Sequence, residues 1–521
     1  MPVTISHPGV YIEEIPSTVR SIISVGTSTT AFIGSAIKGP VNKPFIVNRF
    51  SEYERTFGRL WENSSMSYVV SQFFLNGGSE AVIVRVVPPD AVVAVFENGT
   101  SLKFIAANPG TWANNFKVTI DHDVNPDADN SADLFNMVVK EKIGQDSNDN
   151  DLFVDVESFR NVSYKDDGRY FLTVLKEESN LAYVDEATLP VLTGRPSAGD
   201  FTVSTTQGSD GSNVDGDDIK GEVDTTTGEK SGIYALDKTD IFNILCIPPP
   251  DPQNTPNSFY TDVYVTALNY CKDRRAMLIV DPPSNWTKPE SPLDSSTGVG
   301  SLSLQSENAA IYFPQIKAPD PLSEGRLKSF PPCGVIAGIM SRTDNQRGVW
   351  KAPAGLETSL TGVPDLGLIL TDEENGRLNQ MGVNCLRVLP PAGRVVWGAR
   401  TMRGADRLAD QWKYVPVRRT ALFIEESLYR GTQWVVFEPN DEPLWSQIRL
   451  NVGAFMHDLF RKGAFQGSTT KEAYLVKCDK DTTTQTDIDR GIVNILVGFA
   501  PLKPAEFVII KIQQLAGQET P

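Results

Sequence analysis

The chain has 521 residues, enough for about three domains and for a sizeable buried core. Hydrophobic residues make up 40% and charged residues 22%, which excludes wholesale disorder, and the five scattered cysteines show neither metal-finger nor redox spacing. The formal net charge of -17 argues against binding to nucleic acid, because an acidic surface repels the phosphate backbone. We expect neither a secretory signal nor direct membrane insertion, since the start lacks a basic, apolar leader pattern and no long apolar run follows.

Residues 1–25 are predicted to form an N-terminal arm. Pro2, Pro8 and Pro16 punctuate this stretch, and the only β-prone run in it is Val10 to Ile15. A single strand this short and isolated cannot form a sheet of its own.

An α/β rhythm is predicted over residues 26–90 and 233–370. The first part combines the strand TTAFIGSA, a helical turn after Ser51 with Glu54 in capping-box position, a helix over Ser65 to Asn76, and the strand AVIVRVV. The second part combines IFNILC, AMLIV and AAIYF as strands, a helix over SFYTDVYVTALNYCKD, and a helix around Pro332 to Met340. Strands that alternate with helices indicate a mostly parallel sheet covered on both faces.

Residues 91–232 interrupt this rhythm and are predicted to form a β-rich insertion. Asp, Asn, Ser, Thr and Gly dominate, between short alternating runs such as LFNMVVK and RYFLTVL. We expect the acidic stretch Gly208 to Asp224 to be a mobile loop.

The last part, residues 371–521, has a different composition and is predicted to form a separate α+β domain. Thr371 is expected to cap a helix over Asp372 to Gln380, and NCLRVL pairs with RVVWGARTM as a hairpin. Helices follow over Val417 to Tyr429 and Leu444 to Lys462. The closing GIVNILVGFAPLKPAEFVIIKIQQL predicts two strands separated by prolines.

The motifs of enzymes and cofactor sites are not found in the sequence. None of the three histidines neighbours a nucleophile motif, and there is no Walker A, G-x-S-x-G or G-x-G-x-x-G pattern. We therefore expect no catalytic residues, no metal site and no cofactor. One calcium-loop pattern is weak: Asp146, Asn148, Asn150 and Glu157 have positions 1, 3, 5 and 12, but Asp151 stands where the loop needs glycine. A solvated turn between strands is the favoured interpretation.

The helix over Leu444 to Lys462 has two distinct faces. Six residues at helical spacing form one apolar face: Trp445, Ile448, Val452, Phe455, Met456 and Leu459. The opposite face carries little charge and consists of Ser446, Leu450, Ala454, His457 and Arg461. This second face either packs inside its own domain or contacts a partner.

Several strings near the two ends, taken in order, resemble contractile tail-sheath proteins of phages and of phage-tail-like injection systems. They cover residues 1–90 and about 330–521, and are PGVYIEEIPS, TAFIGSAIKGPVNKP, CGVIAGIMSRTDNQRGVWKAPAG, GARTM, YVPVRRTALFIEESLYRGTQWVVFEPNDEPLW, GAFQG and PAEFVIIKI. The ordered set carries the resemblance, while residues 91–232 add nothing to it.

The resemblance implies a structural polymer and no enzyme. Sheath subunits stack as hexameric rings around an inner tube, contract, and drive the tube through a target envelope, with baseplate and terminator or cap proteins as further partners. Assembly would take place in the bacterial cytoplasm. It also implies that residues 26–90 and 233–370 form an outer domain, that 371–521 form an inner domain, and that the insertion lies on the outer surface. A capsid or receptor-binding protein is the alternative.

Both ends of the chain are then expected to exchange strands between subunits. A β-prone run tethered by prolines has unpaired backbone groups, and addition to a neighbour's sheet satisfies them. The residues concerned are Val10, Tyr11, Ile12 and Ile15 in the arm and Phe507, Val508, Ile509, Ile510 and Ile512 at the other end. Pairing within one subunit is the alternative. Leu450, Ala454, His457 and Arg461 are the candidates for the surface that faces the tube.

Overall fold

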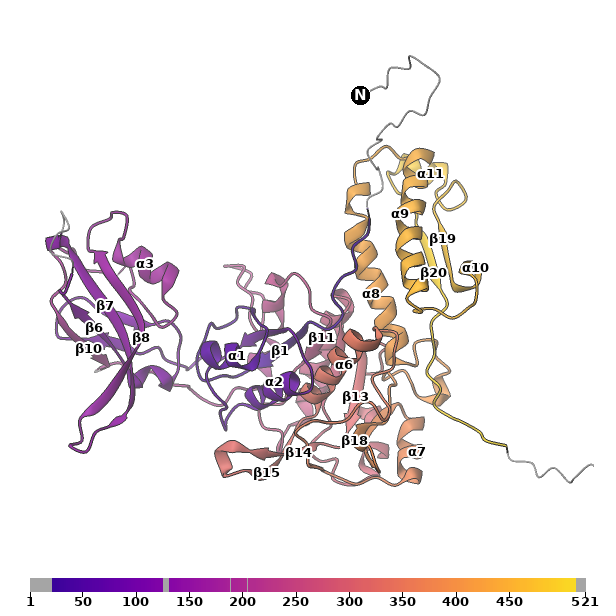
Figure 1. Ribbon diagram of the computed structural model, residues 1–521, viewed down its shortest axis with the longest axis horizontal. Helices are drawn as coiled ribbons and strands as arrows, with labels where there is room; N and C mark the ends of the chain where they lie inside the picture. Colours follow the sequence, from indigo (N-terminus) through magenta and orange to yellow (C-terminus); the bar gives the residue numbers. More distant parts are fainter. Residues whose placement is uncertain (1–20, 125–130, 188, 204, 512–521) are drawn as a thin grey trace, which may run out of the picture. The chain divides into compact units, whose positions relative to one another are not determined.

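The computed structural model describes residues 21–124, 131–187, 189–203 and 205–511 (Figure 1). The chain divides into two compact units. The large unit comprises Ser28–Asn345 and Pro353–Val415, and the described part of the small unit comprises residues 21–27, Gln346–Ala352 and residues 416–511. Among the described residues, no helix is long and apolar enough to cross a membrane.

An eight-stranded sheet forms the centre of the large unit, in the order β18-β17-β13-β12-β11-β1-β3-β2. Its strands are β1 (Thr30–Gly34), β2 (Phe45–Val47), β3 (Ala81–Arg85), β11 (Ile244–Cys246), β12 (Met277–Val280), β13 (Ala309–Phe313), β17 (Val383–Leu389) and β18 (Gly393–Val396). The inner strands pair in parallel, and β2 and β18 are the antiparallel edges. The predicted mostly parallel sheet is confirmed.

Helices cover both faces of this sheet, which explains the nearly continuous apolar runs of its strands. Successive residues of β1 point to opposite faces: Ala31 and Ile33 join one buried cluster, and Phe32 joins the other. The first cluster includes residues of α5 (Tyr264–Asp273) and α7 (Asp372–Gln380). The second includes residues of α1 (Phe50–Phe57), α2 (Ser65–Leu75) and α6 (Cys333–Arg347).

The helix starts agree with the sequence signals in two of three cases. Ser64 caps α2 by accepting a hydrogen bond from the Ser67 N–H, and Thr371 and Glu374 form the capping box of α7. The capping box expected at Ser51 is wrong, because α1 begins at Phe50 after Arg49, whose side chain makes no capping bond. Instead, the Glu52 carboxylate accepts from the Asn48 N–H at 2.9 Å.

The β-rich insertion forms a seven-stranded antiparallel sheet with its own core, in the order β8-β7-β6-β10-β4-β5-β9. Its elements are β4 (Val95–Glu97), β5 (Phe104–Ala106), β6 (Phe116–Asp121), β7 (Leu134–Gln145), β8 (Asp151–Ser163), α3 (Phe171–Glu178), β9 (Ala182–Tyr183) and β10 (Gly199–Val203). The calcium-like spacing lies in the turn between β7 and β8, where the Asp146 carboxylate accepts from the N–H groups of Asn148 and Asn150.

The insertion ends earlier than residue 232. Val92 and Ser209 pair through two backbone hydrogen bonds of 2.9 and 3.0 Å, which closes its base. The acidic stretch after it is ordered, in contrast to the predicted mobile loop: α4 (Gly216–Lys220) has an Asp215–Asp218 capping box. Ile219 of α4 is fully buried in the core of the parallel sheet, which anchors this segment to the large unit.

The boundary expected at residue 371 is also displaced. Residues 371–415 belong to the large unit, because β17 pairs in parallel with β13 and β18 then forms the sheet edge. A small three-stranded sheet of β14 (Ile316–Asp320), β15 (Arg326–Phe330) and β16 (Asp365–Leu366) completes this unit. Strand pairing over long sequence distances therefore sets the boundary at Pro416.

The small unit consists of two long helices and a two-stranded sheet. Its elements are α8 (Val415–Gly431), α9 (Glu442–Arg461), α10 (Thr470–Ala473), β19 (Tyr474–Lys477), α11 (Gln485–Asp489) and β20 (Leu496–Phe499). The start of the described chain packs on α8, where the Val25 N–H donates to the Ser427 hydroxyl and Arg419 donates to the Thr27 carbonyl at 2.8 Å.

A buried carboxyl at the end of β12 gives the large unit a defined pH dependence. Asp281 is 1% exposed, and its Oδ1 accepts from the Cys333 N–H at the start of α6 at 2.9 Å. Its Oδ2 has no partner among the described residues. Burial raises the pKa of Asp281 from 3.8 to about 7, although the hydrogen bonds from Cys333 oppose this shift.

We predict that the Asp281 carboxyl lowers the stability of the subunit as the pH rises from about 4 to about 7, because the unfolded chain releases a proton that the folded chain retains. Asp281→Asn should remove this fall and raise stability at pH 8 by a few kcal/mol at most, since one pKa unit corresponds to about 1.4 kcal/mol. Urea unfolding of the full chain at pH 5 and pH 8, for wild type and Asp281→Asn, measures this difference in the free energy of unfolding.

Asp294→Asn is the matched control. Hydrogen bonds from Ser296 and Thr297 lower the pKa of Asp294 to about 2, so its contribution has the opposite sign and is lost as the pH falls. Equal pH dependence in wild type and Asp281→Asn would contradict the assignment.

Candidate functional site

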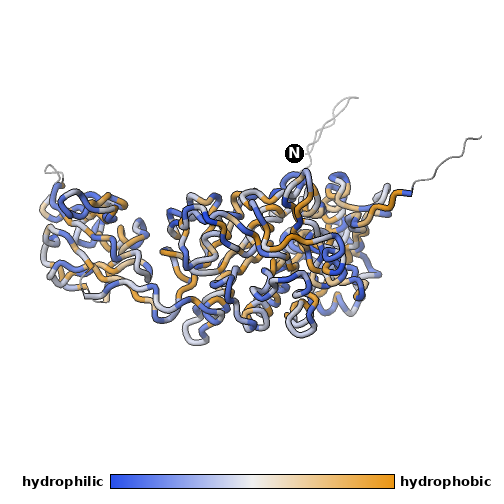
Figure 2. The backbone as a smooth tube through the Cα atoms, turned by 90° about the horizontal axis from the view of Figure 1, so that it is seen from below, coloured by the Kyte–Doolittle hydropathy of each residue, from blue (hydrophilic) through white to orange (hydrophobic). Residues whose placement is uncertain are grey.

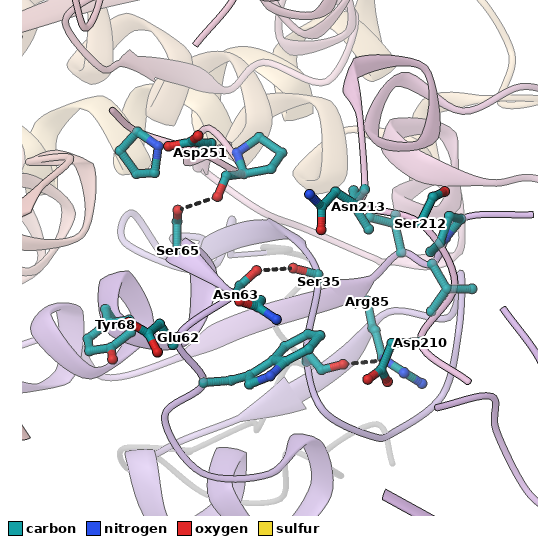
Figure 3. A pocket seen from close by; sticks show the side chains of 18 of the residues that line it. Ser35, Glu62, Asn63, Ser65, Tyr68, Arg85, Asp210, Ser212, Asn213 and Asp251 are labelled. Atoms are coloured by element: carbon teal, nitrogen blue, oxygen red, sulfur yellow. Dashed lines mark hydrogen bonds between the residues drawn. The ribbon is translucent and has the colours of Figure 1, made fainter. Parts of the chain in front are cut away.

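A cavity of about 820 Å³ lies at the carboxyl edge of the parallel sheet (Figure 3). The chain continues from β1 to β3 on one side and returns after the insertion to β11 on the other, so the strand order reverses here. Segments that follow each of these strands line the cavity, including Ser35, Pro88 and Asp251. Ligand sites of α/β sheets commonly lie at such a position, so its chemistry must be considered.

The polar groups around this cavity mostly bond to the protein itself. The Arg85 guanidinium donates to the carbonyls of Ala36, Gly39 and Pro109 at 2.8–2.9 Å, which holds the base of the insertion on the sheet. The Ser65 hydroxyl donates to the Pro249 carbonyl at 2.6 Å. These bonds give the cavity walls a structural role.

The described lining of the cavity contains serines, carboxylates and a lysine, but neither histidine nor cysteine. Elsewhere in the described ranges, no group of three or more His, Cys, Asp or Glu side chains could hold a metal ion. His122 bonds to the Pro196 carbonyl at 2.8 Å, and His457 lies on α9.

The small unit offers a different kind of site, an open sheet edge. β19 and β20 pair antiparallel, and no other strand of the described chain joins them. One isolated bridge, between Phe465 and Pro501, lies beyond the end of β20. A sheet of two strands leaves backbone donors and acceptors unpaired on both edges, which is a template for strand addition.

The two faces of this small sheet differ. Tyr474 and Val476 point toward α9 and are half-buried, while the alternate residue Leu475 is 46% exposed. In β20, Val497 and Phe499 are half-buried against the same cluster. This alternation, YLVK followed by LVGF, is the sequence signal for the sheet; our sequence analysis identified the second strand and missed the first.

The core between the β19–β20 sheet and α9 is half complete within one chain, in the sense that half of its apolar side chains are only partly buried. Among the described residues, 14 apolar side chains of the small unit are buried and another 14 are only partly buried against them. The cluster on one face of the large sheet has 33 buried residues and only 5 partly buried ones. The small unit therefore exposes apolar surface that a folded subunit normally covers.

The C-terminal segment is also apolar and uncovered. Residues 502–511 form no strand in the chain, and Figure 2 shows the end of the described segment as predominantly hydrophobic. Four consecutive side chains are 74–82% exposed: Phe507, Val508, Ile509 and Ile510. The other strand-exchange candidates, Val10, Tyr11, Ile12, Ile15 and Ile512, lie outside the described residues.

The two faces of α9 agree with the helical pattern. All six residues of the predicted apolar face are buried, with exposures of 0–6%. Leu450, Ala454, His457 and Arg461 are exposed, and Leu450 is 56% accessible. His457 has one side-chain neighbour of note, the Tyr474 hydroxyl at 3.4 Å. The described part of the small unit thus leaves this second face open.

Comparisons with known proteins match both units. The phage tail sheath protein central domain matches residues 231–402, and the phage tail sheath C-terminal domain matches residues 409–514. Together the two matches cover more than half of the 521 residues.

Curated relatives carry the same description. The tail sheath protein of Vibrio phage KVP40 is 25% identical over 186 residues, which are 36% of this chain and 26% of the relative. The tail sheath protein of Burkholderia phage BcepMu is 25% identical over 269 residues, 50% of this chain and 54% of the relative. The chain thus spans about a quarter to a half of the length of these relatives.

A solved sheath has the same fold over nearly the whole chain. The helical sheath protein of the anti-feeding prophage, in its contracted state, aligns with a TM-score of 0.57 and 23% identity. The alignment covers 98% of this chain and 100% of the solved one. The likeness includes the insertion as well as the two matched domains.

Proposed function

Because the chain belongs to the phage tail sheath family, we propose that it is the structural subunit of a contractile sheath, which polymerises around an inner tube and contracts to drive that tube through a target envelope. The half-complete core of the small unit is the observation that supports this most directly. A subunit whose small-unit core stays partly uncovered needs strands from other copies of the chain to cover that core. The family match favours this function over a capsid or receptor-binding protein.

Strand exchange would supply that material. The sheet of β19 and β20 has two open edges, and each chain has two β-prone ends. In the C-terminal end, the side chains of Phe507 to Ile510 are exposed. Added strands would pair the open backbone groups and cover the half-buried side chains of Tyr474 and Val497. We propose that the arm and the C-terminal segment come from neighbouring copies.

This arrangement suits a polymer that changes shape. Residues 500–511 form no helix or strand apart from a bridge at Pro501, and Pro501 and Pro504 lie in this stretch. Such a tether can change direction while the exchanged strand stays paired, so ring contacts can repack without separation of the subunits. Hexameric rings stacked helically are the proposed assembly.

The remaining partners follow from the same proposal. The solved neighbours include a chain of the anti-feeding prophage baseplate and a chain of its helical sheath in the contracted state. We propose that this chain likewise contacts an inner tube, a baseplate and a terminator or cap protein, in a phage tail or a tail-like injection particle. Assembly in the bacterial cytoplasm is part of this proposal. The exposed face of α9, with Leu450, Ala454, His457 and Arg461, is the proposed contact with the tube.

The strand-exchange proposal predicts that Ile509→Pro abolishes assembly. Ile509 is 82% exposed, so the change leaves the unassembled subunit as stable as before, but proline removes a ladder donor. An exchanged strand forms about six backbone bonds, each worth roughly 1 kcal/mol net. Negative-stain microscopy of the purified chain detects the hollow cylinders of wild type.

Ile509→Val is the control for that variant, because it keeps a β-prone apolar side chain with a backbone donor. It should assemble as wild type does. Removal of Met1–Ile15 should prevent assembly in the same way as Ile509→Pro. Ordinary cylinders from either defective chain would refute strand exchange at that end.

The peripheral place proposed for the insertion predicts that cylinders form without it. Residues 93–208 can be replaced by Asn-Gly, because Val92 and Ser209 are already paired and need only a two-residue turn. A longer deletion, of residues 93–230, should instead destabilise the large unit, since it removes the buried Ile219. A soluble short-deletion chain that forms no cylinders would contradict the peripheral placement.

The tube-contact proposal predicts that Arg461→Glu separates two modes of assembly. The variant should form empty sheaths of the contracted type but should not assemble extended sheaths on tubes, because a charge is reversed on the proposed contact. Lys462→Glu is the matched control, with the same charge change on another face of α9. Co-assembly with purified tubes, followed by microscopy, measures both. Normal tube loading by Arg461→Glu would place the contact elsewhere.

A further inference from the structure

A phenylalanine occupies the glycine position of a tight turn between α8 and α9. Val435 to Glu438 form a β-turn closed by a hydrogen bond of 3.2 Å from the Glu438 N–H to the Val435 carbonyl. Val436 has φ -65° and ψ 129°, and Phe437 has φ +71°. These are the angles of a type II turn, whose third residue is normally glycine or asparagine because of its positive φ.

The two central side chains of this turn are largely uncovered by the chain that carries them. Phe437 is fully exposed and Val436 is 59% exposed. A bulky residue in the left-handed region is disfavoured by contact between its Cβ and the backbone, and an exposed ring has no packing to compensate for that. Asparagine at position 437 would stabilise this turn better than phenylalanine does. The aromatic ring therefore does not serve the stability of the isolated subunit.

The turn is held firmly from its C-terminal side. The Asn440 Nδ2 donates to the Ile492 carbonyl at 3.0 Å, and its Oδ1 accepts from the Trp445 Nε1 at 2.9 Å. Asp441 then caps α9, with Pro443 in its first turn. Side-chain bonds therefore fix the chain that follows Phe437, and the turn itself is closed by its backbone hydrogen bond.

The exposed pair directly follows two residues of the small-unit core along the chain. Trp434 and Val435 are partly buried against the small-unit cluster, and Val436 and Phe437 come next in the sequence. A partner that completes the core would meet these two side chains as well.

We propose that Val436 and Phe437 form a preorganised knob that inserts into an apolar pocket of a second copy of this chain. The proposal rests on the proposed polymer, in which neighbouring copies complete the small-unit core. A rigid aromatic side chain that loses little conformational freedom on binding is the usual anchor of such contacts. The unfavourable backbone angle is then maintained by the contact that the ring makes after assembly.

Phe437→Asn tests the proposal in the full-length chain. Asparagine tolerates a positive φ, so the unassembled subunit should have an equal or higher midpoint in urea unfolding. Loss of the buried ring should raise the critical concentration for polymer formation by about tenfold or more. Phe437→Tyr, which keeps the ring and the turn, should polymerise at nearly the wild-type concentration. Sedimentation and negative-stain microscopy measure both effects.

Three results would overturn the inference. The first is polymerisation of Phe437→Asn at the wild-type concentration. The second is a lower unfolding midpoint for Phe437→Asn, which would make the ring a part of the subunit fold. The third is normal formation of empty polymers with a failure only to cover tubes, which would make the tube the partner. Absence of polymers from the wild-type chain would instead refute the proposed function itself.

Discussion

Two strands cannot complete a sheet, and this constraint determines how the small unit can be used. β19 and β20 leave two backbone edges open, and the side chains on their inner face are only half-covered by α9. Burial of apolar surface is the main favourable term in folding, so an uncovered layer is a source of binding free energy for whatever completes it. Other copies of the chain carry suitable segments, because Phe507 to Ile510 are exposed and β-prone.

The large unit shows the opposite condition. Its parallel sheet is covered on both faces, and its two clusters have few partly buried members. Long-range contacts hold it together: the Arg85 guanidinium bonds to four carbonyls, one of them Pro109 in the insertion. A complete core and a bonded insertion make this unit self-contained, whereas the strand exchange that we propose would use the small unit for the connections between subunits.

This division of roles fits a sheath that changes its lattice. Contacts between complete bodies can be exchanged at low cost when they are small and partly polar. Connections made by backbone pairing between strands are stronger than such contacts and have a fixed direction. They tolerate rotation of the subunits when a flexible tether joins each exchanged strand to its own subunit.

Much of the local structure could be predicted from residue patterns. The alternation of strands and helices, the start of α2 at Ser65, the cap at Thr371 and the apolar face of α9 all follow from rules that act over a few residues. The ordered strings at both ends also indicated the sheath family. The Ser51 capping box shows the limit of such rules, because a neighbouring carboxylate, Glu52, bonds to the backbone before the helix and changes its start.

The unit boundaries and the order of the acidic segment depend on contacts between residues far apart in the sequence, so only the tertiary structure decided them. Residues 371–415 join the large unit because β17 finds its partner in β13, about 70 residues earlier, and no local pattern encodes that pairing. The acidic stretch around Ile219 is ordered for the same reason, since one buried side chain anchors it. The sequence by itself determined the elements and the family. The half-complete core of the small unit, the unpartnered Oδ2 of the buried Asp281 and the exposed Phe437 emerged only in three dimensions, because burial is a property of packing and not of residue order.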